Sequence, residues 1–174
     1  VPFTAIHLAA EKAQGTTLII GAQNMNDATE GAFTGEVSAK MLRDAGAQFV
    51  LLGHSERRQY FGETNDFINR KVKRALAEGL QPLLCIGETR EQRDAQETED
   101  TLATQLNECL SDIEPSQIQH IIIAYEPVWA IGTGITATPA LAQEAHHFCR
   151  EYISQQWGPE TASRIPLLYG GSVR

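Results

Sequence analysis

The chain has 174 residues, a formal net charge of −8 and an isoelectric point of about 5.1. Hydrophobic residues make up 42% and charged residues 21%, which is typical of a globular protein and predicts a single domain over residues 1–174. The acidic balance argues against a nucleic-acid-binding surface. The longest apolar stretches are too short to span a bilayer, and no signal or transit peptide is visible.

Three cysteines, Cys85, Cys109 and Cys149, are widely spaced, and each falls inside an expected strand or helix. Their odd number and spacing match neither a disulfide framework nor a metal site. We interpret them as buried, reduced thiols, which indicates a cytoplasmic protein without a bound metal.

The hydrophobic pattern predicts strands and helices that alternate along the chain. The expected strands are residues 17–22, 49–52, 82–86, 121–125 and 165–169. The expected helices are residues 4–14, 36–45, 65–78, 91–110 and 139–156. This alternation indicates βαβ units and therefore an α/β fold with a parallel sheet.

Nearly every expected strand is a continuous apolar run, as in parallel strands that helices cover. Two architectures fit this pattern, a closed eight-fold barrel and an open doubly wound sheet. The open sheet favours a G-x-G-x-x-G turn directly after its first strand, and the sequence lacks one. Chemically useful residues instead follow several different strands, which favours the barrel.

The first candidate for chemistry is Glu126, which ends the apolar run 121–125 and precedes Pro127. An apolar loop with two glycines follows, up to a helix that Thr138 and Pro139 begin. A carboxylate at the carboxyl end of a buried strand, followed by such a loop, indicates a base beneath a lid. A structural glutamate in an ion pair remains the alternative.

His54 follows the strand 49–52, and the segment 169–172 (YGGS) follows the last expected strand. In a parallel barrel these strand ends meet on one face, where a histidine and a carboxylate suit proton transfer and the glycines let backbone amides approach an anion. Taken alone, each feature has a structural explanation: His54 as a satisfied polar residue, the glycines as turns, and Glu56 as a helix N-terminal charge or ion pair.

The motifs together resemble the triosephosphate isomerase family. Residues 53–58 (GHSERR), 124–134 (AYEPVWAIGTG) and 169–172 (YGGS) are similar to its signature segments. Residues 31–36 (GAFTGE) resemble its dimer loop, and residues 85–88 (CIGE) resemble another of its strand ends. The resemblance implies a (β/α)8 TIM barrel, a homodimer, no cofactor, and the interconversion of dihydroxyacetone phosphate and glyceraldehyde 3-phosphate through an enediolate, in glycolysis and gluconeogenesis.

The resemblance also implies a role for each candidate residue. Glu126 is the base that moves the proton, His54 is the neutral electrophile, and Glu56 is a further catalytic candidate. Gly132 and Ser172 match contacts to the substrate phosphate, and Thr34 matches the dimer-loop residue that reaches the partner subunit. The lid loop comprises Pro127, Val128, Trp129, Ala130, Ile131, Gly132, Thr133, Gly134, Ile135, Thr136 and Ala137.

The chain departs from the family in the lid and at its two ends. Ile135 stands where many members carry lysine, which implies altered lid kinetics. The sequence begins at Val1 rather than at an initiator methionine, and it ends at Arg174, where a new element is expected to start. We therefore expect an incomplete barrel of about five strands, without the family's N-terminal asparagine and lysine or its C-terminal Gly-Gly pair. Two alternatives stay open: an inactive barrel fragment that acts as a binding or interaction module, and another phosphosugar enzyme on the same fold.

Overall fold

A five-stranded parallel sheet forms the centre of the computed structural model, which describes residues 1–131 and 136–172. The strands are β1 (Gly21–Ala22), β2 (Phe49–Leu52), β3 (Gln81–Ile86), β4 (Ile122–Tyr125) and β5 (Leu167–Tyr169). They lie side by side in chain order, each parallel to the next. A doubly wound sheet reverses its strand order at a switch point, whereas a barrel winds in one direction. The α/β prediction is confirmed, and the winding is that of a partial barrel.

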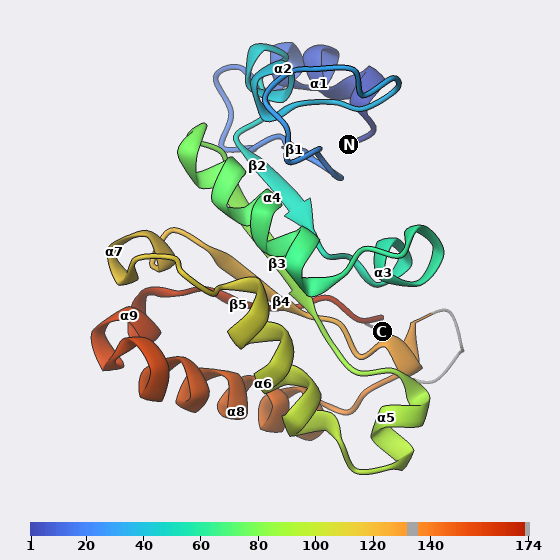
Figure 1. The fold of residues 1–174 in the computed structure, drawn as a ribbon, viewed down its shortest axis with the longest axis vertical. Helices are drawn as coiled ribbons and strands as arrows, with labels where there is room; N and C mark the ends of the chain where they lie inside the picture. The colour runs from blue at the N-terminus through green and yellow to red at the C-terminus, as the bar shows by residue number, and fades with distance from the viewer. Residues whose placement is uncertain (132–135, 173–174) are drawn as a thin grey trace.

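Helices connect the strands and cover one face of the sheet (Figure 1). They are η1 (Phe3–Ala5), α1 (Ile6–Ala13), α2 (Ala39–Asp44), α3 (Ser55–Phe61), α4 (Asn65–Ala77), α5 (Arg90–Asp94), α6 (Thr98–Cys109), α7 (Pro115–Ile118), η2 (Val128–Ala130), α8 (Pro139–Trp157) and α9 (Pro159–Arg164). Helix α4 packs on β2 and β3, α6 on β3, and α8 on β4. Within the described part of the chain, none of these helices is long and apolar enough to cross a membrane.

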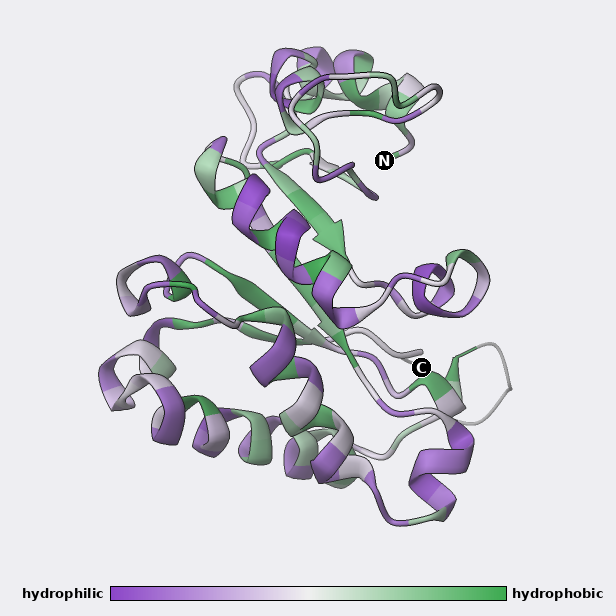
Figure 2. Ribbon diagram, viewed as in Figure 1, coloured by the Kyte–Doolittle hydropathy of each residue, from purple (hydrophilic) through white to green (hydrophobic). Residues whose placement is uncertain are grey.

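The two faces of the sheet are buried to different degrees. Val50, Leu52 and Leu84 belong to the same core as residues of α4 and are completely buried. Leu51 and Leu83 alternate with them, so they point to the opposite face, where they are only partly buried. Figure 2 shows the hydrophobic strands beside helices whose polar residues are on the outside. The face of the sheet that carries Leu51 and Leu83 is therefore more open to solvent than the face that packs on α4.

The expected helix over residues 91–110 is wrong as a single element. It is two helices, α5 and α6, and the chain turns between them at Gln96, which has a φ of 63°. Residues 91–100 contain only one apolar residue, Ala95, so this stretch has no apolar face to keep it aligned on the sheet. The burial that fixes α6 begins with Leu102 and Leu106.

Three other boundaries differ from the expectation. The strand predicted over 17–22 pairs only at Gly21–Ala22, and Leu18 and Ile19 are exposed. The helix expected from residue 36 begins at Ala39, because the Ser38 side chain accepts a hydrogen bond from the Met41 N–H. The helix expected from residue 4 begins as the 3₁₀ turn η1. By contrast, Thr138 caps α8 as predicted, and all three cysteines are buried and free.

Candidate active site

His54 and Glu126 meet where β2 and β4 end. The Nε2 atom of His54 lies 3.0 Å from Oε1 of Glu126. The other carboxylate oxygen, Oε2, accepts a hydrogen bond of 3.0 Å from the Ser55 N–H. Seventy-two positions separate the two side chains in the sequence, and the parallel sheet brings them into direct contact.

The first turn of α3 holds the imidazole. His54 is the N-cap of this helix, and its Nδ1 atom accepts a hydrogen bond of 3.3 Å from the Glu56 N–H. Because Nδ1 is an acceptor, the imidazole proton of the neutral form is on Nε2, where it is donated to Glu126. The site thus presents an N–H donor and a carboxylate from two different strand ends.

The surroundings of His54 raise the pKa of its imidazole. The hydrogen bond to Glu126 raises the pKa of His54 above its ordinary value of 6.5, partial burial opposes the rise, and the charges of Glu126 and Glu56 add to it. Only 4% of the surface of Glu126 is exposed. A buried carboxylate next to a half-buried imidazole is a pairing typical of functional sites.

The backbone of Glu126 is fitted closely to β3. Its N–H donates to the Ile86 carbonyl at 2.7 Å. A Cβ on Gly87 would lie only 1.7 Å from the Glu126 carbonyl oxygen, and a Cβ on Gly170 would lie 3.0 Å from its Cγ. Glycine at these two positions therefore lets the strand ends converge on the carboxylate.

Replacing Gly87 with alanine is expected to displace the Glu126 backbone, because the methyl group cannot fit beside its carbonyl. The cost to stability should be at least about 1–3 kcal/mol, the usual cost of overpacking a fixed backbone. Urea unfolding measures it, with Gly62→Ala as the control, because a Cβ at Gly62 would meet nothing within 4 Å, although its φ of +65° adds some strain. Equal losses in the two variants would contradict the close fit.

Glu56 lies beside this pair. Its carboxylate oxygen Oε2 is 3.8 Å from Nδ1 of His54, and its side chain is 68% exposed. Its backbone N–H, rather than its carboxylate, makes the hydrogen bond to the imidazole. Together with Leu51, Arg57 and Phe61, these two residues border a cavity of about 350 Å³, large enough for a small metabolite.

The start of the lid loop is fixed to neighbouring elements. The indole N–H of Trp129 donates to Oε1 of Glu88 at 2.8 Å, and the guanidinium of Arg93 lies 4.2 Å from the centre of a Trp129 ring. Tyr125 donates its hydroxyl to the same Glu88 oxygen at 3.1 Å, and burial of this phenol raises its pKa. Of the predicted lid, Pro127–Ile131 and Thr136–Ala137 are described, whereas Gly132, Thr133, Gly134 and Ile135 lie outside the described residues.

The remaining predicted residues lie at or near the surface. The segment 169–172 joins the site through Gly170, whose N–H donates to the Tyr125 carbonyl at 2.7 Å. Ser172 follows in an exposed position. Thr34 is exposed in the loop between β1 and α2. Both remain candidates by resemblance.

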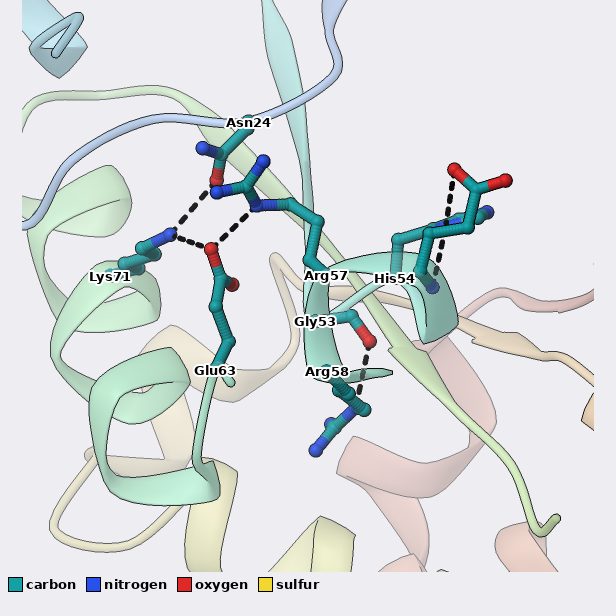
Figure 3. Close-up of polar contacts among 8 residues, drawn as sticks. Asn24, Gly53, His54, Arg57, Arg58, Glu63 and Lys71 are labelled. Atoms are coloured by element: carbon teal, nitrogen blue, oxygen red, sulfur yellow. Dashed lines mark hydrogen bonds and ion pairs between the residues drawn. The ribbon is translucent and has the colours of Figure 1, made fainter. Parts of the chain in front are cut away.

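A buried polar cluster beside the site was missed in the sequence (Figure 3). The Lys71 ammonium lies 2.6 Å from Oε1 of Glu63 and 2.9 Å from Oδ1 of Asn24, and the Nε of Arg57 lies 2.5 Å from the same Glu63 oxygen. One signal was available, because Lys71 shares the buried face of α4 with Ile68, and charged residues on such a face are rarely buried without a partner. The partners themselves come from other elements.

Parallel strands that lie in chain order and wind in one direction define a partial β/α barrel. A histidine and a carboxylate meet at the carboxyl ends of its strands. A family model described as triosephosphate isomerase matches residues 1–174. The chain belongs to the triosephosphate isomerase family, a family of isomerases, as its motifs predicted.

Individual relatives agree with this assignment. The chain is 56% identical over 173 residues to the triosephosphate isomerase of Protochlamydia amoebophila, which covers 99% of this chain and 66% of that protein. It is 49% identical to the enzyme of Chloroflexus aurantiacus and 50% identical to that of Roseiflexus sp., covering 99% of this chain and 69% and 68% of those proteins. The chain thus spans about two thirds of the length of the curated relatives it matches.

Proposed function

We propose that this protein interconverts dihydroxyacetone phosphate and glyceraldehyde 3-phosphate. The observation that carries the proposal is the 3.0 Å contact between His54 Nε2 and Glu126 Oε1 at the strand ends of a chain from this family. The reaction moves one proton between adjacent carbons, and it needs a base and a hydrogen-bond donor in one pocket.

In this proposal Glu126 removes a proton from one carbon of the substrate and returns it to the neighbouring carbon. His54 donates its Nε2–H to the oxygen that becomes negatively charged in the enediolate, which lowers the energy of that intermediate. Because the two side chains contact each other, a bound substrate has to separate them. Glu126 then exchanges its bonds to His54 and Ser55 for an approach to the carbon.

The substrate phosphate is proposed to bind the backbone at Gly132 and Ser172, as the family resemblance implies. Residues 127–137 are proposed to cover the intermediate and exclude water from it. The hydrogen bond between Trp129 and Glu88 supports a fixed starting point for this lid. Glu56 contributes through its position in the first turn of α3 and its charge beside His54.

The assembly proposed for the protein is a homodimer in the cytoplasm, with no cofactor. The resemblance of residues 31–36 to the family's dimer loop and the exposure of Thr34 support the dimer. The three buried free thiols fit a reducing compartment.

The test is an assay in both directions with purified protein whose intact mass has been measured. We expect turnover of the two triose phosphates and little or none of other phosphosugars at equal concentration. A mass near 19.1 kDa with no turnover would favour the fragment that only binds, whereas preferred turnover of a different phosphosugar would assign another reaction to the same fold.

A further inference from the structure

We propose that Arg58 is a positioning residue, which sets the separation of His54 and Glu126 by joining the end of β2 to the end of β3. Arg58 lies in the middle of α3, and its side chain reaches back to the ends of β2 and β3. The Nε atom donates to the Gly53 carbonyl at 2.8 Å, a bond drawn in Figure 3. The Nη2 atom donates to the Cys85 carbonyl at 3.2 Å.

Each of these carbonyls is linked through the backbone to one member of the catalytic pair. Gly53 directly precedes His54. Cys85 directly precedes Ile86, whose carbonyl accepts the backbone N–H of Glu126 at 2.7 Å. One planar guanidinium therefore ties the peptide that carries the imidazole to the strand that aligns the carboxylate.

The fit around Gly53 leaves little freedom. Its φ is +73°, and a Cβ there would lie 3.0 Å from Nη2 of Arg58 and 3.2 Å from the Cys85 carbonyl oxygen. A backbone in this conformation is far more favourable for glycine than for other residues. The guanidinium and the two carbonyls thus form a closely packed unit at the base of the site.

The guanidinium of Arg58 also contacts side chains of the helices α4 and α6. Its Nη1 donates to Oδ1 of Asn65 at 2.5 Å, and Nη2 lies 3.7 Å from Sγ of Cys109. Asn65 in turn donates to Glu108 of α6 at 2.8 Å. The guanidinium thus has four partners, which suit the rigid fork of arginine and which a lysine ammonium cannot reproduce.

The test compares Arg58→Lys and Arg58→Met with Arg150→Met in the full chain. Arg150 is a matched control, because its guanidinium also bridges two backbone carbonyls, those of Ala162 and Ile165. These carbonyls precede β5, so they lie at the amino end of the strands, whereas His54 follows the carboxyl end of β2. Loss of either arginine should lower stability, so urea unfolding of all variants is measured first.

The deciding measurement is the pKa of His54 by NMR titration, with its signal identified from His54→Gln. The charged groups near His54 are Glu126, Glu56 and Arg57. If Arg58 sets the contact with Glu126, the pKa falls toward 6.5 in both Arg58 variants and stays at the wild-type value in Arg150→Met. Removal of a nearby positive charge alone would raise it, so a fall identifies the lost contact.

Activity gives a second measurement, which rests on the proposed function. We expect a fall of about 100-fold in kcat with little change in KM for the Arg58 variants, because a displacement of about 1 Å costs that much. Arg58 variants that match Arg150→Met in stability and keep the wild-type pKa of His54 would overturn the proposal. If Arg58→Met does not fold, Arg58→Lys and Asn65→Ala carry the same test. The titration remains decisive even if the protein isomerises nothing.

Discussion

Replacing Glu126 with glutamine is expected to lower kcat by about 10²–10⁴-fold, the usual contribution of a positioned base. Glutamine has the same shape and can still accept the Ser55 N–H, so the fold is retained while the proton acceptor is lost. In deuterated water, the wild type should place solvent deuterium on the substrate carbon, and Glu126→Gln should not. Both turnover and deuterium incorporation are measured by NMR.

Two variants make this result specific. Glu126→Asp keeps the carboxylate but withdraws it by about one methylene, so an intermediate loss of about 10²-fold is expected. Glu144→Gln makes the same chemical change at an exposed position of α8 and should leave turnover unchanged. Full turnover with deuterium exchange in Glu126→Gln would mean that another group is the base.

The second large effect concerns stability. Glu63→Ala should lower the free energy of unfolding by about 3–5 kcal/mol, because it leaves the Lys71 charge buried without its carboxylate partner. The side chains of Lys71 and Glu63 are only 1% and 2% exposed, and their charged atoms are 2.6 Å apart. The ammonium would then keep its hydrogen bond to Asn24 and its contact with the Phe67 ring, neither of which carries a negative charge. Urea unfolding measures the loss.

Two comparisons identify the cause of that loss. Glu160→Ala removes a partner of the exposed pair with Arg164 and should cost less than about 1 kcal/mol. The double variant Glu63→Leu/Lys71→Met removes both buried charges and should recover most of the stability. If Glu63→Ala costs no more than Glu160→Ala, the buried pair does not stabilise the fold.

The same variant should depend on pH in a defined direction. Burial lowers the pKa of Lys71 below 10.5, and removal of the Glu63 carboxylate, which raises it, lowers it further. Between that lowered pKa and 10.5 the unfolded chain binds more protons than the folded chain, so folding becomes more favourable as pH rises. Glu63→Ala should therefore regain part of its lost stability relative to the wild type as the pH approaches 10.5.

Much of the fold could be predicted from local patterns. Four of the five strands and the helices α4 and α8 lie within a few residues of their expected bounds, because continuous apolar runs and capping residues such as Thr138 act over short distances. The error at residues 91–110 has a local cause as well. A polar stretch with good helix formers satisfies the propensity for a long helix, but only an apolar face aligns it with the rest of the protein.

The residues of the candidate site could be named from the sequence, because Glu126 and His54 belong to motifs at strand ends. The sequence by itself thus determined the family, the α/β class and the pair of groups that carry the proposed chemistry. Only the tertiary structure decided the contact between His54 and Glu126, the burial of Lys71 against Glu63, and the hold of Arg58 on Gly53 and Cys85. These contacts join residues on different elements, so they depend on how strands and helices pack, which no periodicity along one element records.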